Sequence, residues 1–491
     1  MTALSKSTYL AGCQCPRRLW LRSFAPEVAS ESDGAAWGTV GSEIGRRAHA
    51  LFPGGVLVEG DGASHDDAVA RTRALLADLS VPAIFEGAFV HAGVGVRVDV
   101  LERLSGGGWG LREVKSGLRV RDIHLHDAAV QRFVLGGNGL RVPSVEIIHL
   151  DRAYVRGEGD VDWPRLFTRV DVSTEVVCLL SGVPARVAAL HRVLARTDPP
   201  AVEPDGHCFS PHACEFWAHC TREKPVDWVY RLPGWPSPFA ELRAAGVERI
   251  VDIPDDFPLS PVQARARDAV RSGREFLGDD LGAALAALGP PTAYLDFETI
   301  SPGVPLYPGT RAYERIPFQW SLHEVDATGV LAHRELLTDG RHDPRREFTE
   351  RLLEALGGGA GPVLVYSSYE DGVLAELAVT LPDLAPGIDA LRARLVDLLP
   401  IVRQSIYHPA FGGSFSLKAV APALVEGFGY GDLEQIVGGG AASAAFLRIA
   451  SGAVTDPEEE ARLRGALHVY CERDTLALVE LHRALRARSG V

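Results

Sequence analysis

Residues 97–117 read RVDVLERLSGGGWGLREVKSG and set the pattern for the first half of the chain. Two runs rich in apolar residues, 95–104 and 109–115, flank a glycine-rich segment, which is typical of a β-hairpin. Glu113 and Lys115 are two positions apart on the second run, so their side chains point to the same face of the strand. Asp99 lies near the end of the first run. The stretch therefore predicts a hairpin that presents two carboxylates and an ammonium group together.

The flanking segments extend this hairpin into an α/β unit. Strands are expected at 83–91 and 145–150, and a helix at 127–135 between the hairpin and the later strand. Further helices are expected at 37–50, 66–79 and 183–196, the last of which ends before the breaker Asp198-Pro199-Pro200.

Composition limits the classes of protein that the chain can be. It has 491 residues, of which 46% are hydrophobic and 23% charged, so two or three folded domains are expected. The 50 basic and 64 acidic residues give a net charge of −14, which argues against a simple basic coat protein for nucleic acid. No run approaches the ~18 apolar residues of a membrane span, and the N-terminus lacks a signal-peptide pattern. We expect a cytoplasmic protein without a membrane partner.

Asp99, Glu113 and Lys115 form a set that suits phosphodiester hydrolysis. Carboxylates hold Mg²⁺, which polarises phosphate and activates water, while a neighbouring ammonium orients the nucleophile and balances charge. A surface hairpin with an exposed ion pair is the alternative reading of these three residues.

The surrounding residues resemble the RecB-type branch of the PD-(D/E)XK nucleases. Glu86 lies on the preceding expected strand, and Gln131 follows in HDAAVQRFVL. The resemblance implies a restriction-endonuclease-like fold, a catalytic set of Asp99, Glu113, Lys115 and Gln131, and Mg²⁺ or Mn²⁺ held by Asp99 and Glu113.

The chain departs from that family pattern at two positions. The tyrosine usual four residues after the glutamine is Leu135. The usual metal-binding histidine of the first helix is Gly41, for which Glu43 or His49 would have to substitute.

Seven cysteines in a chain without a secretory signal favour metal or redox use over disulfides. Cys208, Cys214 and Cys220 form a trio, and Cys15 in QCPRRLWL is the expected fourth ligand, with Cys13 as a competitor. Their spacing is longer than the C-x₂₋₄-C pairs of structural zinc sites and fits such a site less well, while four thiolates can hold an iron–sulfur cluster; zinc and unliganded thiols are the alternatives. The same nuclease branch has one N-terminal cysteine and a C-terminal trio around a 4Fe-4S cluster, and the resemblance implies that cofactor here. Cys178 and Cys471 are expected to be core residues.

The second half restarts the α/β alternation. Buried strands are expected at AYLDF (293–297) and within GPVLVYSSY (361–369), and a helix follows the second. The segment 225–289 reads as a helical linker, in which ELRAAGVERIVDI resembles half of a helix-hairpin-helix module. The expected domains are therefore 1–224, a linker at 225–289, and 290–491.

Four acidic residues of the second half form another candidate metal site. Asp296 and Glu298 lie at i and i+2 of one strand, so both carboxylates leave the sheet on the same face. Burial of like charges is costly unless a cation compensates, and a pair of divalent ions would do so. Glu370, or less favourably Asp371, follows the next strand. Asp474 comes four residues after Tyr470, one helical turn, so both side chains can face one cleft.

This succession resembles the DEDD exonucleases of the ribonuclease H-like fold, in the branch with a tyrosine in its third motif. The resemblance implies that Asp296, Glu298, Glu370 and Asp474 hold two metal ions and that Tyr470 positions the attacking water. Glutamate at position 370 replaces the usual aspartate. Asp397 is expected to be mainly a helix cap. Lys418, in FGGSFSLKAVAP, is either near the substrate strand or an ordinary surface lysine.

The whole succession resembles a bacterial family of nuclease–nuclease fusions whose C-terminal half is catalogued only as a domain of unknown function. We expect a metal-dependent nuclease that hydrolyses DNA, with one RecB-type site and one 3′–5′ exonuclease-type site. Its partner would be DNA that is single-stranded or has free ends, and arginines near Cys15 and Lys115 would contact the strand. A non-catalytic scaffold that binds nucleic-acid ends and a ribonuclease are the alternatives.

Overall fold

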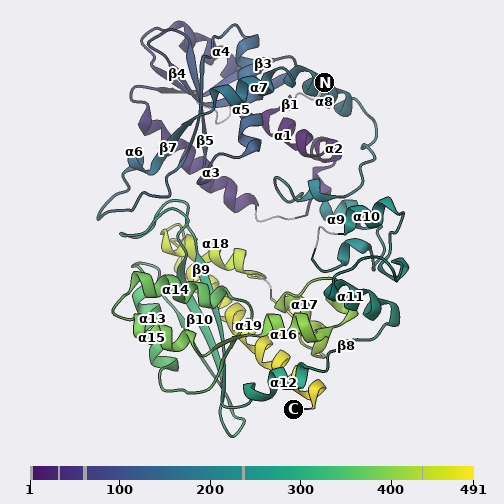
Figure 1. Ribbon diagram of the computed structural model, residues 1–491. Coiled ribbons are helices and arrows are strands. Elements are labelled where there is room, and N and C mark those ends of the chain that lie inside the picture. The colour runs from purple at the N-terminus through teal and green to yellow at the C-terminus, as the bar shows by residue number, and fades with distance from the viewer. Residues whose placement is uncertain (1–3, 31–33, 59–63, 235–237, 434, 491) are drawn as a thin grey trace. The chain divides into compact units, whose positions relative to one another are not determined.

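The computed structural model describes residues 4–30, 34–58, 64–234, 238–433 and 435–490 (Figure 1). The chain divides into two compact units. Unit 1 comprises residues 1–223 and 303–313, and unit 2 comprises 224–302 and 314–491. Both units combine helices with a mixed sheet, so the expected α/β class is confirmed.

Unit 1 is built on a seven-stranded mixed sheet in the order β2-β3-β4-β5-β6-β7, with β1 also paired to β4. Its strands are β1 (Leu4–Ser5), β2 (Val56–Leu57), β3 (Ala83–His91), β4 (Val94–Arg103), β5 (Trp109–Lys115), β6 (Ser144–Leu150) and β7 (Phe167–Asp171). The pairs β3–β4 and β4–β5 are antiparallel, as a hairpin requires, whereas β6 lies parallel to β5. The predicted strands at 83–91 and 109–115 have the bounds expected.

Strand β4 changes its neighbour along one edge. Its start, Val94–Gly95, pairs with β1, and its last part, Val100–Arg103, pairs with β5. Asp99 therefore lies between these two pairings, where the ends of β1 and β5 come towards each other. This fork brings the N-terminal segment next to the end of the hairpin.

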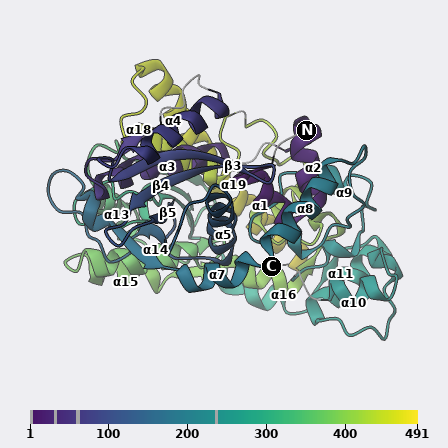
Figure 2. The same cartoon turned by 90° about the horizontal axis from the view of Figure 1, so that it is seen from above.

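Helices cover both faces of this sheet. Among the described residues, the α-helices of unit 1 are α1 (Lys6–Gln14), α2 (Pro16–Phe24), α3 (Gly34–Ala48), α4 (His65–Ala77), α5 (Asp122–Gly137), α6 (Trp163–Leu166), α7 (Ser173–Leu180), α8 (Val183–Leu194) and α9 (Trp217–Thr221). Ala128 and Val134 of α5 share a core with Leu111 of β5, whereas Ile44 of α3 packs in a second core with Val114. Alternate residues of β5 thus face opposite cores. Figure 2 shows α3, α5 and the strands between β3 and β5 from above.

Unit 2 contains a five-stranded sheet in the order β11-β10-β9-β12-β13. Its strands are β9 (Thr292–Ile300), β10 (Ile316–Val325), β11 (Leu331–Leu337), β12 (Val363–Val365) and β13 (Leu395–Asp397). The first three are antiparallel, and β12 and β13 run parallel to β9. Phe297 of β9 packs edge-on against Phe348 in the apolar core on one face. Asp296 and Glu298 alternate with Phe297, so they point to the other face.

The helices of unit 2 include one of 33 residues at the C-terminus. They are α10 (Phe239–Ala244), α11 (Pro261–Ser272), α12 (Leu281–Leu285), α13 (Arg345–Leu356), α14 (Tyr369–Thr380), α15 (Ala385–Arg392), α16 (Leu398–Ser405), α17 (Leu417–Leu424), α18 (Gly439–Ala450) and α19 (Pro457–Ser489). Helix α19 packs against β9 and β10 on the face opposite α13 and α14.

The segment expected to be a helical linker lies within unit 2. A short strand, β8 (Phe276–Leu277), pairs with β14 (Ile406–Tyr407), which ties this segment to the later part of the unit. The stretch ELRAAGVERIVDI forms the end of α10, a turn at Gly246 with φ of 74°, and a 3₁₀ turn at Ile250–Asp252.

No single helix among the described residues is long and apolar enough to cross a membrane. The pair α7 and α8 passes that test of length and composition only when taken together, and it bends by 58° at its break.

Candidate functional site

The first cluster of acidic and basic side chains lies at the fork of the unit 1 sheet. Lys115 Nζ lies 2.6 Å from Glu113 Oε1, and both residues lie on β5. Asp99 Oδ2 accepts a hydrogen bond of 2.7 Å from the backbone N–H of Val114, which holds this carboxylate next to the strand. The structure thus brings the three predicted residues of the hairpin together.

Helix α5 adds two side chains from one face. Gln131 Nε2 donates to Glu113 Oε2 at 2.6 Å and to Asp127 Oδ1 at 2.9 Å, and Lys115 Nζ lies 2.6 Å from Asp127 Oδ2. Gln131 is fully buried, and Asp127 is 2% exposed. Gln131 was predicted and Asp127 was missed. The signal for Asp127 was its position four residues before Gln131, which places both on the same side of a helix.

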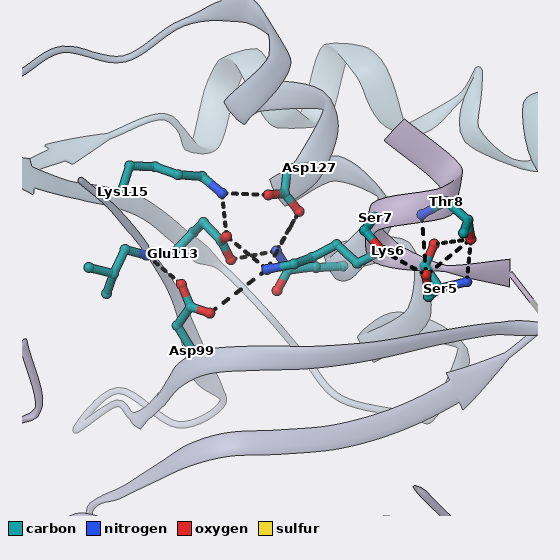
Figure 3. Close-up of polar contacts among 10 residues, drawn as sticks. Ser5, Lys6, Ser7, Thr8, Asp99, Glu113, Lys115 and Asp127 are labelled. Carbon is teal, nitrogen blue, oxygen red and sulfur yellow. Dashed lines mark hydrogen bonds and ion pairs between the residues drawn. The ribbon is translucent and has the colours of Figure 1, made fainter. Parts of the chain in front are cut away.

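Lys6 completes this cluster, and the sequence reasoning missed it. Ser5 caps α1 by accepting a hydrogen bond from Thr8 N–H, and Lys6 is the first residue of the helix. Its Nζ lies 2.8 Å from Glu113 Oε1, 3.8 Å from Asp99 Oδ1 and 3.9 Å from Asp127 Oδ1. Figure 3 shows the side chain extending among the three carboxylates. One signal was available, because the chain has few lysines: Lys6, Lys115, Lys224 and Lys418.

The carboxylates of this cluster have opposite pKa shifts. Burial, followed by repulsion from Glu113, raises the pKa of Asp99 to about 7. Burial also acts on Glu113, but the ammonium groups of Lys115 and Lys6 outweigh it and hold the pKa of Glu113 well below its ordinary value. Glu113 is therefore the ionised centre of the cluster, whereas Asp99 can exchange a proton near neutral pH.

The positions where the chain departs from the family pattern lie outside this cluster. Glu43 forms ion pairs with Arg46 and Arg47 on α3, and the ring of His49 stacks on Phe85 at 3.9 Å. Leu135 is buried in the apolar core. None of these residues contacts the described carboxylates of the cluster.

Four cysteines line one cavity of unit 1, and they are the four predicted: Cys15, Cys208, Cys214 and Cys220. Cys15 lies between α1 and α2, and the N–H of Cys214 donates to the carbonyl of Cys208 at 2.8 Å. Burial raises the pKa of Cys214 to about 11, so a positively charged ligand would be needed to keep its thiolate. Cys13 packs against the apolar core instead.

The spacing of these thiols bears on the kind of metal that they suit. A tetrahedral zinc ion with Zn–S bonds of about 2.3 Å brings sulfur atoms to within about 3.8 Å of one another. Among the described residues, no three of these thiols belong to a set of donor atoms that all lie within 4.8 Å of one another. An iron–sulfur cluster holds its thiolates farther apart, because each binds a different iron. The described thiols are therefore not gathered as closely as a single zinc ion would require.

The other two cysteines differ from each other. Cys178 is exposed on α7, so its prediction as a core residue is wrong. Cys471 is buried as predicted, but its Sγ lies 3.8 Å from Asp296 Oδ2, next to the acidic residues of unit 2.

The second cluster gathers acidic side chains between β9 and α19. One carboxylate oxygen from each of Asp296, Glu298 and Asp474 lies within 4.8 Å of the others. Burial and then repulsion from Asp474 raise the pKa of Glu298 to about 8, and the same two causes raise that of Asp296. Asp474 Oδ1 is buried without a hydrogen-bond partner among the described residues. Three acidic groups therefore meet here without a cationic side chain bonded to them among the described residues.

Glu370 joins this cluster from the first turn of α14. It is 3% exposed, its Oε2 has no hydrogen-bond partner among the described residues, and burial raises its pKa to about 7. Its charge in turn raises the pKa of Asp296. The alternative, Asp371, is bonded to Arg392 at 2.7 Å. Asp397 accepts a hydrogen bond from Leu399 N–H and caps α16, as predicted.

Two aromatic residues and a lysine border the second cluster. Lys418 Nζ donates to the hydroxyl of Tyr470 at 2.7 Å and lies over the rings of Tyr470 and Tyr430. Tyr470 lies one turn before Asp474 on α19, as predicted. Lys418 is thus not an ordinary surface lysine, and Tyr430 was missed because its loop has no motif of its own.

Comparison with protein families gives one match. A domain of unknown function (DUF2779) matches residues 293–416, which include Asp296, Glu298 and Glu370 and agree with the expected C-terminal resemblance. A search of the curated proteins finds no match to the chain.

Proposed function

We propose that this chain is a metal-dependent nuclease that hydrolyses DNA phosphodiester bonds at two sites. Unit 1 would be a restriction-endonuclease-like domain of the RecB type, and unit 2 a ribonuclease H-like exonuclease domain. The observation that carries the proposal is the convergence of Asp296, Glu298 and Asp474, whose carboxylate oxygens lie within 4.8 Å of one another, with Asp296 half-buried and the other two residues buried.

The energetics of the second cluster favour a site for divalent cations. Burial of several carboxylates without a counter-charge costs free energy, and here it raises their pKa values. The oxygen donors suit Mg²⁺ or Mn²⁺, and the unpartnered oxygens of Glu370 and Asp474 leave lone pairs for them. Asp296, Glu298, Glu370 and Asp474 would hold two such ions.

The residues around those ions have separable roles. When bound, a pair of divalent ions activates water and neutralises the charge that develops on the phosphate. The hydroxyl of Tyr470, fixed by Lys418, would orient the attacking water. Lys418 would also offset negative charge at the edge of the site, since burial raises the pKa of Asp474 and the Lys418 ammonium opposes that rise.

The first cluster supports a second site of the same chemical class. Asp99 and Glu113 would hold a divalent ion, and Lys115 would orient or deprotonate the nucleophile. Gln131 and Asp127 would keep Glu113 and Lys115 in place through their hydrogen bonds. The thiols of Cys15, Cys208, Cys214 and Cys220 would bind a 4Fe-4S cluster that joins the N-terminal helices to the end of unit 1.

A cavity beside the first cluster supports a nucleic-acid substrate. It has a volume of about 1000 Å³, and its lining includes Arg18, Arg22 and Arg121 together with Ser116, the residue after Lys115. Guanidinium groups bind phosphate oxygens well. A single strand that enters this cavity would lead towards the carboxylates, which favours DNA that is single-stranded or has free ends.

One observation favours a second candidate function for unit 1. Lys6 and Lys115 already compensate the acidic residues there, so this unit can be stable without a metal ion. A scaffold that binds nucleic-acid ends without cutting them would have this property.

The proposal is tested with purified full-length protein, Mg²⁺ or Mn²⁺, and end-labelled single-stranded DNA, duplex DNA and RNA. The variants Asp99→Asn and Asp296→Asn remove one carboxylate from each cluster, and Glu43→Gln and Asp371→Asn are the matched controls outside them. Loss of degradation in Asp296→Asn with normal rates in the controls supports the unit 2 site. Equal rates of degradation in the wild-type protein and all four variants would reject both sites. Activity on RNA alone would identify a ribonuclease.

The cofactor proposal has its own readout. Protein isolated without oxygen is expected to be brown and to lose its visible absorbance in Cys214→Ser, whereas Cys178→Ser, which changes an exposed thiol elsewhere, keeps it. Zinc without iron in the wild-type protein would contradict the cluster.

A further inference from the structure

Two histidines and a glutamate gather on unit 2 without using any of the four acidic residues described above. His323 on β10 and His333 on β11 are direct cross-strand partners, and their ring centroids are 4.5 Å apart. Glu472 on α19 approaches from the facing helix, with Oε1 at 3.8 Å from His333 Nδ1. One donor atom from each residue lies within 4.8 Å of the others.

The hydrogen bonds behind the two rings determine which nitrogen atoms are available. The hydroxyl of Thr475 donates to the carbonyl of Glu472 at 3.1 Å and so accepts from its other neighbours. Those neighbours are His323 Nδ1 at 2.8 Å and the hydroxyl of Ser321 at 2.7 Å. With the Thr475 proton directed to that carbonyl, His323 carries its proton on Nδ1, which leaves the lone pair of Nε2 free.

The position of the proton on the His333 ring follows from the same hydrogen bonds. In the same arrangement the Ser321 hydroxyl donates its proton to Thr475 and accepts from His333 Nε2 at 2.9 Å. The lone pair of His333 then lies on Nδ1, the atom nearest to Glu472. Each ring thus donates one N–H to a buried hydroxyl and keeps the other nitrogen as an acceptor, which is how proteins orient histidines that bind metals.

A neighbouring histidine and glutamate lie closer together than His333 and Glu472. His468 lies one turn before Glu472 on α19, and its Nδ1 is 2.8 Å from Glu335 Oε1 on β11. His333 Nδ1 and Glu472 Oε1 are 3.8 Å apart, compared with 2.8 Å in the neighbouring pair. A distance of 3.8 Å is too long for a hydrogen bond. The second histidine, His323, is 3% exposed and burial lowers its pKa to about 4, so its ring is neutral.

From these donors we infer that His323, His333 and Glu472 form a binding site for a zinc-class divalent cation. Two imidazole nitrogens and one carboxylate are the ligand set that such ions take when a fourth position stays open to water. A bound ion would join α19 to both β10 and β11. Its ligand on α19, Glu472, is two residues before Asp474. The inference does not rest on the proposed nuclease activity, because no side chain is shared between the two sites.

The test uses Co²⁺ as a spectroscopic probe on the full chain after treatment with a chelator. Co²⁺ held by nitrogen and oxygen donors in a four-coordinate site absorbs in the visible range, and Zn²⁺ should displace it. The variants His333→Gln and Glu472→Gln each remove one ligand. The matched controls are His468→Gln and Glu335→Gln, which remove the neighbouring ion pair on the same elements.

We expect each ligand variant to lower the affinity for Co²⁺ by at least about tenfold, whereas the controls and Asp296→Asn bind as the wild-type protein does. The same absorbance in all of these proteins, or its loss in the control variants too, would overturn the inference. Glu472 is exposed, so its substitution tests the site even if His333→Gln folds poorly.

Discussion

The two clusters of acidic residues differ in where their positive charge comes from. In unit 1, Lys6 and Lys115 bring ammonium groups to within 2.8 and 2.6 Å of Glu113. In unit 2, Lys418 bonds to Tyr470 rather than to a carboxylate, and the pKa values of Glu298 and Asp296 are raised. Buried carboxylates can therefore be stabilised from within the chain or left dependent on an added ion. The second cluster is the one that should respond more strongly to metal.

The largest expected effect is on catalysis in unit 2. Asp296→Asn removes a carboxylate from the centre of the cluster and should slow Mg²⁺-dependent degradation of DNA ends by about a thousandfold. Rates on end-labelled DNA measure this. Asp371→Asn, one residue from Glu370 but bonded to Arg392, should keep the wild-type rate. If Asp99→Asn slowed degradation a thousandfold and Asp296→Asn did not slow it, unit 1 rather than unit 2 would carry the metal-dependent activity.

The next effect is on stability. Mn²⁺ at a hundredfold excess over its dissociation constant should stabilise unit 2 by about 2.7 kcal/mol, because it binds only the folded cluster. Thermal unfolding with Mn²⁺ and with chelator measures this difference. Asp296→Asn should abolish most of it, whereas Glu113→Gln should retain most of it. A response that disappears in Glu113→Gln instead would place the dominant ion in unit 1.

A smaller effect is expected when the first cluster loses its own cation. Lys6→Met removes an ammonium that competes with a divalent ion for Asp99 and Glu113, so the affinity of unit 1 for Mn²⁺ should rise by about tenfold, or 1.4 kcal/mol. Electron paramagnetic resonance of free Mn²⁺ measures it in an Asp296→Asn background. Lys224→Met is the control, since Lys224 lies outside both clusters and pairs with Glu248. Unchanged or weaker binding in Lys6→Met would contradict this role.

The smallest expected effect is on how the stability of the folded protein depends on pH in the absence of metal. The pKa of Glu298 is about 8 in the folded protein against an ordinary value of 4.5, so the folded state holds a proton that the unfolded state has released. Stability should therefore fall as the pH rises from 4.5 to 8. Glu298→Gln cannot titrate, so its stability should fall less over that range in thermal melts with chelator. An identical slope in both proteins would show that this carboxyl group is not protonated.

Local sequence patterns correctly predicted the strands that carry Asp99, Glu113, Asp296 and Glu298. The alternation around Asp99 and Glu113, and the i, i+2 spacing of Asp296 and Glu298, give the orientation of a side chain once a strand is recognised. Lys6 could not be found in this way. It reaches Glu113 because β1 pairs with the start of β4, and a two-residue strand has no periodic signal.

The second site shows the same limit. The approach of Lys418 to Tyr470 depends on how α17 packs on α19, which are 52 residues apart at that contact. Asp371 and Glu370 are equally acidic in sequence, and only the pairing of Asp371 with Arg392 separates them. Contacts between distant segments, rather than local patterns, decide these residues.

The most direct test of the divalent-ion site in unit 2 is anomalous X-ray diffraction from crystals of the full chain soaked in Mn²⁺. The predicted result is a manganese peak bonded to carboxylate oxygens of Asp296, Glu298 and Asp474, lost in Asp296→Asn. No peak there at saturating Mn²⁺, with the three carboxylates turned away from one another, would contradict the site.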